Sequence, residues 1–367
     1  MRGLERRTAM AKKMKAQVFY EPLKMKLVDV PVPKIMDDEL LVRVKACGIC
    51  GSDVAYFYGL SPLETKDGKG PLILGHEFTG QVVEVGKLVK QSGLFKKGDR
   101  VVVNPLQYCF ACEVCGKGQF NLCENKTVLG VSIDGGFAEY AKCKATAAVK
   151  LPKNVSYEQG ALTEPLACAF YGIRNMQLEV GHFCVVFGAG PIGLMMVQLI
   201  KSSGASCVVL VDTVDYRLVA GKKVGADVVL NVADEKSKYY CKDLKKEIER
   251  LTDGKFADRA ITPTGAVPAM EAAIDITGRR SIIVFFGLPG ADDYVRVPAL
   301  QSIFWDKTIR FSWLAPLTWP PALQALSAGL VKVDKLITHS FKLKDLEKAL
   351  EIVKDKKQRV LKALIKP

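Results

Sequence analysis

Apolar and polar positions along the chain change their spacing near its middle. Before residue 150, short β-type runs are separated by turn residues, and they predict strands over 17–20, 40–46, 79–85, 100–103 and 137–142. From about residue 164, helical stretches alternate with apolar strand-like runs over 183–187, 208–211, 227–230, 259–261 and 281–286. Such alternation is typical of a parallel sheet covered by helices. The sequence therefore predicts a mostly β unit followed by an α/β unit.

The last part of the chain carries fewer elements. After residue 311 the pattern predicts one amphipathic helix over 344–357 and one closing strand-like run over 360–365. This segment is too short to form a domain of its own. We therefore expect it to pack back on one of the two units.

Composition supports a folded chain of two domains. Of 367 residues, 49% are hydrophobic and 25% are charged, which allows a sizeable core. The eleven cysteines are few for a disulfide scaffold and odd in number, and no secretion signal follows the basic start. We expect reduced thiols and a cytoplasmic location. The longest uncharged stretch, 183–200, is broken by glycines and a proline, so it predicts a buried strand and helix and no membrane span.

The formal net charge of +14 lies mainly at the two ends of the chain. Residues 1–15 hold six basic side chains against one acidic, and residues 332–367 hold eleven basic against five acidic. The C-terminal charges alternate in sign, as on a solvated helix face. We therefore expect neither nucleic acid nor a membrane as a partner. The first fifteen residues fit a flexible tail, a cloning remnant or a short targeting segment.

A glycine-rich turn follows the apolar run 183–187. It carries a G-x-G-x-x-G pattern that closes a strand and opens a helix, formed by Gly188, Gly190, Pro191, Ile192 and Gly193. In this context the helix amides can hold the pyrophosphate of a dinucleotide. The alternative is an ordinary glycine turn.

An acidic residue follows where a dinucleotide site requires one. Asp212 ends the next apolar run, where a carboxylate accepts hydrogen bonds from ribose hydroxyls and repels a 2′-phosphate. This favours NAD over NADP. Arg217 tempers the preference, because its guanidinium can lie beside either group.

Four cysteines form a C-x2-C-x2-C-x7-C pattern, namely Cys109, Cys112, Cys115 and Cys123. Thiolates at this spacing can close a tetrahedral zinc site. The alternatives are an iron–sulfur cluster, whose fourth cysteine would follow sooner, and a disulfide pair, which a reducing compartment disfavours. A zinc site with four protein ligands has no open position at which to activate water, so its role would be to stabilise the lobe that carries the four cysteines.

A second constellation is dispersed along the chain. The segments 47–53 (CGICGSD), 75–77 (GHE) and 163–166 (TEPL) offer thiolates, one imidazole and carboxylates, and one of each would make a zinc site with an open fourth position. Spacing alone does not establish it, since a lone cysteine or histidine is more often a core residue.

These motifs resemble the zinc-containing medium-chain alcohol and polyol dehydrogenase superfamily, of the sorbitol and threonine dehydrogenase type. The resemblance runs from about residue 15 to 367 and rests on 50–53 (CGSD), 75–77 (GHE), the four cysteines, 135–140 (GGFAEY), 164–166 (EPL), 188–193 and 365–367 (IKP). It implies an α/β protein with a GroES-like β-barrel catalytic domain plus a Rossmann doubly wound parallel-sheet domain for the cofactor. The first domain would comprise 1–165 with 311–367 and the second 166–310.

The resemblance also implies two zinc ions per chain. One would be structural, in the four-cysteine lobe. The other would be catalytic, with Cys50, His76 and Glu164 as ligands and Glu77 as the rival third ligand. Asp53 would orient the ring of His76.

Further roles come from the same resemblance. Ser52 would take the proton of the substrate, and Lys362 would contact the cofactor pyrophosphate. Ala55 stands where many relatives carry a proton-relay histidine, so a relay here would run through the ribose and water. The motif 318–320 (TWP) is similar to one in sorbitol dehydrogenases, whereas their upstream Arg-Tyr pair is replaced around 311–313 (FSW). A polyol-like pocket with altered polar contacts is implied.

The expected activity is therefore zinc-dependent hydride transfer between NAD(H) and a secondary alcohol of the polyol, inositol or sugar-acid type. The alternative is a non-catalytic sensor or structural relative that binds zinc and NAD(P)H. By the resemblance we expect a homodimer or a homotetramer.

Overall fold

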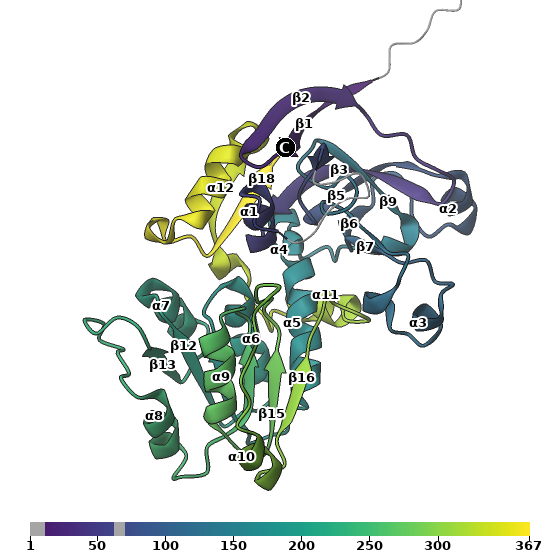
Figure 1. Ribbon diagram of the computed structural model, residues 1–367. Coiled ribbons are helices and arrows are strands. Elements are labelled where there is room, and N and C mark those ends of the chain that lie inside the picture. The colour runs from purple at the N-terminus through teal and green to yellow at the C-terminus, as the bar shows by residue number, and fades with distance from the viewer. Residues whose placement is uncertain (1–11, 62–69) are drawn as a thin grey trace, which may run out of the picture.

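A computed structural model describes residues 12–61 and 70–367, and within them two units lie one above the other (Figure 1). The upper unit joins the purple N-terminal strands to the yellow C-terminal segment, and the lower unit holds the green parallel sheet. Most of the basic N-terminal stretch, residues 1–11, lies outside the described residues.

The upper unit consists mainly of antiparallel strands. A three-stranded sheet has the order β2-β1-β4, formed by β1 (Lys13–Glu21), β2 (Lys24–Pro31) and β4 (Leu72–Ile73). A seven-stranded sheet has the order β10-β6-β5-β3-β18-β17, with β9 also paired to β3. Its strands are β3 (Glu39–Gly48), β5 (Glu77–Val85), β6 (Arg100–Val103), β9 (Tyr140–Lys144), β10 (Ala148–Lys150), β17 (Ile337–Lys342) and β18 (Lys362–Lys366).

Smaller elements complete this unit. They are the ribbon β7 (Leu106–Gln107) with β8 (Thr127–Val128), and the helices α1 (Gly51–Phe57), α2 (Lys87–Ser92), α3 (Glu113–Gly116) and α12 (Leu346–Lys354). One apolar cluster fills the interior and includes Phe19, Phe78 and Phe137. The strands form because β-branched and aromatic residues fit a half-buried pleated surface.

The lower unit is a six-stranded sheet with the order β13-β12-β11-β14-β15-β16. All of its pairings are parallel. The strands are β11 (Phe183–Phe187), β12 (Cys207–Asp212), β13 (Val228–Asn231), β14 (Ala257–Thr262), β15 (Thr277–Phe285) and β16 (Thr308–Phe311). The helices are α6 (Pro191–Ser202), α7 (Asp215–Lys223), α8 (Leu244–Leu251), α9 (Val267–Asp275) and α10 (Ala299–Phe304). The strand order reverses beside β11, which is where doubly wound sheets bind their ligands.

Three helices join the two units, namely α4 (Tyr157–Ala161), α5 (Thr163–Met176) and α11 (Trp319–Ser327). A single buried cluster runs from Ala46 and Val102 in the upper unit through Leu166 of α5 to Leu194 of the parallel sheet unit. The predicted domain boundaries at 165 and 311 stay a prediction. Both fall within an element, α5 and β16 respectively.

Most predicted elements are confirmed, and the differences have local causes. The runs over 100–103 and 183–187 coincide with β6 and β11. The predicted strand 137–142 begins later, as β9, and the predicted helix 344–357 is shorter, because one-turn 3-10 segments flank α12. The prediction does not include β2 and β17, because exposed and partly charged residues in these strands obscure the alternation of apolar and polar positions.

The C-terminal segment returns to the upper unit, as expected. β18 pairs antiparallel with β3, where Ile365 faces Cys47, and parallel with β17. Within the described ranges, no helix is long and apolar enough to cross a membrane.

We predict that Leu364→Ala destabilises the protein by about 2–5 kcal/mol, the usual cost of truncating a buried leucine. Leu364 is 0% exposed in the cluster that spans both units, whereas Leu330 is 56% exposed. Urea denaturation of both variants checks this, with Leu330→Ala expected within about 0.5 kcal/mol of the parent. Equal effects of the two changes would contradict the packing described for β18.

Candidate active site

Three potential metal ligands meet at the junction of β3 and β5. Cys50 caps α1 just after β3, while His76 and Glu77 stand at the start of β5. The two strands pair antiparallel with Gly48 opposite Glu77, so this register brings the three side chains together. The Cys50 sulfur, a His76 ring nitrogen and a Glu77 oxygen all lie within 4.8 Å of one another. One thiolate, one imidazole and one carboxylate fit zinc.

Asp53 holds two members of this group. Its carboxylate accepts a hydrogen bond from the backbone amide of Cys50 at 2.8 Å and lies 3.4 Å from Nδ1 of His76. Burial by itself lowers the pKa of His76, but the charges and hydrogen bonds of Asp53 and Cys50 together outweigh it, and the pKa is raised well above its ordinary value. The contact agrees with the orienting role that the resemblance implied, because a carboxylate behind a histidine fixes ring and tautomer.

Glu77 is balanced by a buried lysine from the far end of the chain. Nζ of Lys362 donates to Oε1 of Glu77 at 2.7 Å and to the carbonyl oxygen of Ile49 at 2.9 Å, and it also contacts Oε2 of Glu77. Burial lowers the pKa of Lys362, yet the adjacent Glu77 raises it above its ordinary value. Gly48 makes room for this pair, since a Cβ there would lie 2.0 Å from Glu77 Oε2.

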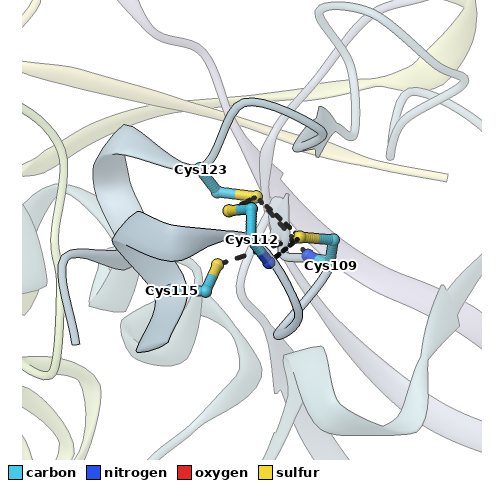
Figure 2. A group of neighbouring side chains, drawn as sticks. All are labelled: Cys109, Cys112, Cys115 and Cys123. Carbon is cyan, nitrogen blue, oxygen red and sulfur yellow. Dashed lines mark hydrogen bonds between the residues drawn. The ribbon is translucent and has the colours of Figure 1, made fainter. Parts of the chain in front are cut away.

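The four-cysteine lobe surrounds α3 (Figure 2). Its sulfur atoms converge, with Cys123 3.5 Å from Cys109, Cys112 3.9 Å from Cys123 and Cys115 4.0 Å from Cys109. Amides of Ala111 and Cys112 donate to the Cys109 sulfur, which lowers the pKa of that thiol to about 6. All eleven cysteines of the chain are free thiols. The donor set therefore fits a closed zinc site and no disulfide.

The glycine turn lies between β11 and α6, as predicted. Gly190 caps α6 and Pro191 is its first residue, so free amides of the first turn face the turn region. A Cβ on Gly193 would lie 1.8 Å from the carbonyl oxygen of Gly188, so only glycine allows this close approach. Ile192 follows Pro191 in the first helical turn.

The carboxylate of Asp212 is fixed at the end of β12. It accepts hydrogen bonds from the amides of Ala189 at 2.6 Å, Thr213 at 2.7 Å and Val214 at 2.9 Å. Asp212 therefore couples the end of β12 to the glycine turn. Nε of Arg217 donates to the hydroxyl of Tyr216, and that hydroxyl donates to the carbonyl oxygen of Val360 in the C-terminal segment.

Comparison with known proteins gives the same family for both units. The family model "Alcohol dehydrogenase GroES-like domain" matches residues 36–153, and the model "Zinc-binding dehydrogenase" matches residues 191–328. The chain is 35% identical to a sorbitol dehydrogenase of Bombyx mori over 92% of this chain and 95% of that protein. The chain belongs to the zinc-containing medium-chain alcohol and polyol dehydrogenases.

Solved structures agree with this assignment. A 2R,3R-butanediol dehydrogenase from Bacillus subtilis matches with a TM-score of 0.85 and 30% identity, covering 96% of this chain and 99% of that one. An alcohol dehydrogenase from E. coli CFT073, complexed with NADH, matches with a TM-score of 0.87 and 29% identity over 97% and 99% of the two chains. The predicted combination of a GroES-like domain with a Rossmann domain is thereby confirmed, and as a member of this family the chain is an oxidoreductase.

The structure distinguishes between the two carboxylates that were expected to compete as the third ligand of the catalytic zinc. Glu77 supplies one of the three clustered donor atoms. Glu164 lies in the first turn of α5 and accepts a hydrogen bond from Cys168 Sγ at 3.4 Å. Burial raises the pKa of Glu164, and nearby His76 and Glu77 act on it in opposite directions. Glu164 thus lies near the cluster, and its role as a ligand stays a prediction.

Other predicted residues of the dehydrogenase have less direct outcomes. Ser52 stands in the first turn of α1, two residues after Cys50. The contact of Lys362 with the cofactor stays a prediction, while its described partners are Glu77 and Ile49. The motif 318–320, which resembles one in sorbitol dehydrogenases, lies at the start of α11. There Thr318 donates to the carbonyl oxygen of Ala167 at 2.7 Å, and Trp319 is buried. These two residues pack α11 on α5.

Sequence reasoning missed the partners that lie behind the cluster. The pair Glu77–Lys362 joins positions far apart along the chain, and no local pattern connects them. The contact between Glu164 and Cys168 could have been found, since positions i and i+4 share one face of a helix.

We predict that Cys112→Ser releases one of two zinc ions per chain and lowers the melting temperature by about 5 °C. A structural zinc contributes directly to folding, and a loss of about 2 kcal/mol shifts a domain of about 200 residues by about 4–8 °C. Zinc analysis and calorimetry check this. Unchanged zinc content would contradict the assignment of this lobe.

Proposed function

We propose that this dehydrogenase transfers a hydride between NAD(H) and a secondary alcohol of the polyol, inositol or sugar-acid type, with a catalytic zinc held by Cys50, His76 and Glu77. The observation that carries the proposal is the meeting of these three donors within 4.8 Å at the β3–β5 junction. Of the two competing carboxylates the proposal takes Glu77, because its oxygen belongs to that group. Two relatives, a sorbitol dehydrogenase and a 2R,3R-butanediol dehydrogenase, support the substrate class.

A zinc ion bound by these donors would act as a Lewis acid that lowers the pKa of a substrate hydroxyl. The chain's own residues then have separate tasks. Asp53 holds the His76 ring at 3.4 Å and the Cys50 amide at 2.8 Å. Lys362 forms a buried ion pair with Glu77, which balances the charge of the carboxylate.

Ser52 is proposed to accept the proton of the substrate hydroxyl. It follows Cys50 by two residues in α1, so its hydroxyl belongs to the same turn as the thiolate donor. Ala55 has no acidic or basic side chain, so it cannot receive this proton from Ser52.

The cofactor is proposed to lie over the turn formed by Gly188, Gly190, Pro191, Ile192 and Gly193, with its pyrophosphate on the first amides of α6. Asp212 supports a preference for NAD over NADP. Its buried carboxylate is fixed by three amides, so it cannot easily turn away from a 2′-phosphate. Arg217 interacts with the Tyr216 hydroxyl, which reduces its freedom to pair with such a phosphate.

The direct test is reduction of NAD by zinc-loaded protein with a panel of secondary alcohols, sugar alcohols, inositols, aldonates and threonine, with NADP in parallel. We expect turnover with one polyol or sugar-acid class and with NAD. Absence of turnover in both directions, despite bound zinc and NADH, would favour the alternative of a non-catalytic sensor.

We predict that Cys50→Ala lowers turnover by about 10²–10³-fold, because zinc supplies several kcal/mol and about 1.4 kcal/mol corresponds to tenfold in rate. This variant should lose one zinc ion and keep its affinity for NADH, measured by fluorescence titration. Cys112→Ser is the matched control, because it loses the other zinc ion. Full turnover of Cys50→Ala would contradict the catalytic assignment.

We further propose a homodimer or homotetramer that contacts a second copy through the β16 edge. Among the described strands, β16 has β15 as its neighbour and lies at the end of the sheet order. Large apolar side chains are exposed beside it, with Leu300, Ile303 and Phe304 of α10 at 66%, 74% and 72%. Unpaired edges and exposed apolar patches are usually covered by partners.

Ile303→Glu should weaken this association, since it places a charge in the apolar patch. We expect light scattering to give a multiple of the chain mass for the parent and a smaller assembly for the variant. A parent that is monomeric at micromolar concentration would contradict the proposal.

The eleven free thiols support a reducing compartment, and we propose the cytoplasm.

A further inference from the structure

The helix α5 carries a thiol, that of Cys168, in contact with the Glu164 carboxylate. Glu164 and Cys168 are separated by one helical turn and therefore lie on one face of α5. Sγ of Cys168 donates a hydrogen bond to Oε1 of Glu164 at 3.4 Å. Cys168 is buried, so water does not easily replace this donor.

Both side chains lie close enough to the proposed catalytic cluster to interact with its charged groups. The pKa of Glu164 is raised by its burial and responds to His76, Glu77 and Lys362. The pKa of the Cys168 thiol is raised well above its ordinary value, by burial first and then by the charge of Glu164, with further contributions from Cys50 and Glu77. In the structure the thiol is the donor and the Glu164 carboxylate the acceptor of their hydrogen bond.

The Glu164 carboxylate nevertheless stays outside the group of donor atoms that lie within 4.8 Å of one another. That group contains Cys50, His76 and Glu77, which leaves one position of a tetrahedral ion for the substrate. A second carboxylate that moved into the group would compete with an alcohol for this position. An open position for the alcohol therefore requires an interaction that holds the Glu164 carboxylate away from this group.

We propose that Cys168 is a positioning residue that holds the Glu164 carboxylate beside the Cys50, His76 and Glu77 group and thereby keeps one coordination position open for the alcohol. The inference rests on the proposed function and deepens it. This role requires only a small, neutral hydrogen-bond donor at position 168. A side chain of similar volume without a donor would release Glu164 toward the metal.

Two substitutions at this position separate the hydrogen bond from packing. Cys168→Val removes the donor and preserves an apolar side chain, while Cys168→Ser preserves a donor. Cys143→Val in β9 serves as the matched control, because Cys143 is another buried thiol, in the apolar core of the upper unit.

The coordination can be observed directly after cobalt(II) is exchanged for zinc. A tetrahedral cobalt ion absorbs strongly in the visible region, and the positions of its bands depend on the identity of its ligands. We expect Cys168→Val to shift these bands in difference spectra, in which the unchanged four-cysteine site cancels, because the Glu164 carboxylate replaces water as the fourth ligand. The same variant should raise KM for the alcohol by about 3–10-fold with kcat within about twofold, because the released carboxylate competes with substrate.

The Cys168→Ser and Cys143→Val variants should both match the parent in spectrum and in KM. The double variant Cys168→Val with Glu164→Gln provides the decisive comparison. Glu164→Gln removes the competing anion, so adding Cys168→Val should have no further effect on the spectrum, as in a double-mutant cycle with full coupling.

Two results would overturn the inference. One is a Cys168→Val spectrum and KM equal to those of the parent, and the other is an effect that persists undiminished in the Glu164→Gln background. Parent protein that binds cobalt but oxidises no alcohol would contradict the proposed function alone, since the spectra still decide the role of Cys168. Parent protein that binds no cobalt at Cys50 and His76 would contradict both.

Discussion

The buried pair of Glu77 and Lys362 is the contact on which the site depends. It places a carboxylate and an ammonium group together with 1% and 4% of their side-chain surfaces exposed. Glu77 shares this region with the carboxyl groups of Asp53 and Glu164, and it is itself buried, so an unpaired Glu77 would be strongly disfavoured. Breaking a buried pair of this kind typically costs about 3–5 kcal/mol. Because Lys362 comes from β18, the last strand is part of the electrostatics of the site as well as of the sheet.

The two groups of potential metal ligands differ in the kinds of donor atoms they contain and in where these come from. In the four-cysteine lobe every donor is a sulfur atom of one local segment, which leaves no position for substrate. At the β3–β5 junction the donors are of three kinds and come from the ends of two paired strands. The helix α5 adds a further carboxylate beside them and also packs against the parallel sheet unit. The β3–β5 junction and the glycine turn are thus linked by one continuous apolar core.

Local patterns in the sequence predicted those parts of the molecule that local chemistry determines. The valine-rich run of β6, the glycine turn after β11 and the four-cysteine spacing each lie within a few residues, and each is found as expected. The relation of Lys362 to Glu77 could not be predicted, because it depends on the register of β18 against β3. Whether Glu77 or Glu164 is the better third ligand depends in the same way on where α5 begins relative to β5, which no local pattern in the sequence determines.

The central claim is that one zinc ion lies among Cys50, His76 and Glu77 and a second among the four cysteines. Anomalous diffraction from crystals of the zinc-loaded protein, recorded on both sides of the zinc edge, tests it most directly. We predict two anomalous peaks per chain, one at each group. A single peak at the four cysteines, with none between Cys50 and His76, would contradict the account of the catalytic site.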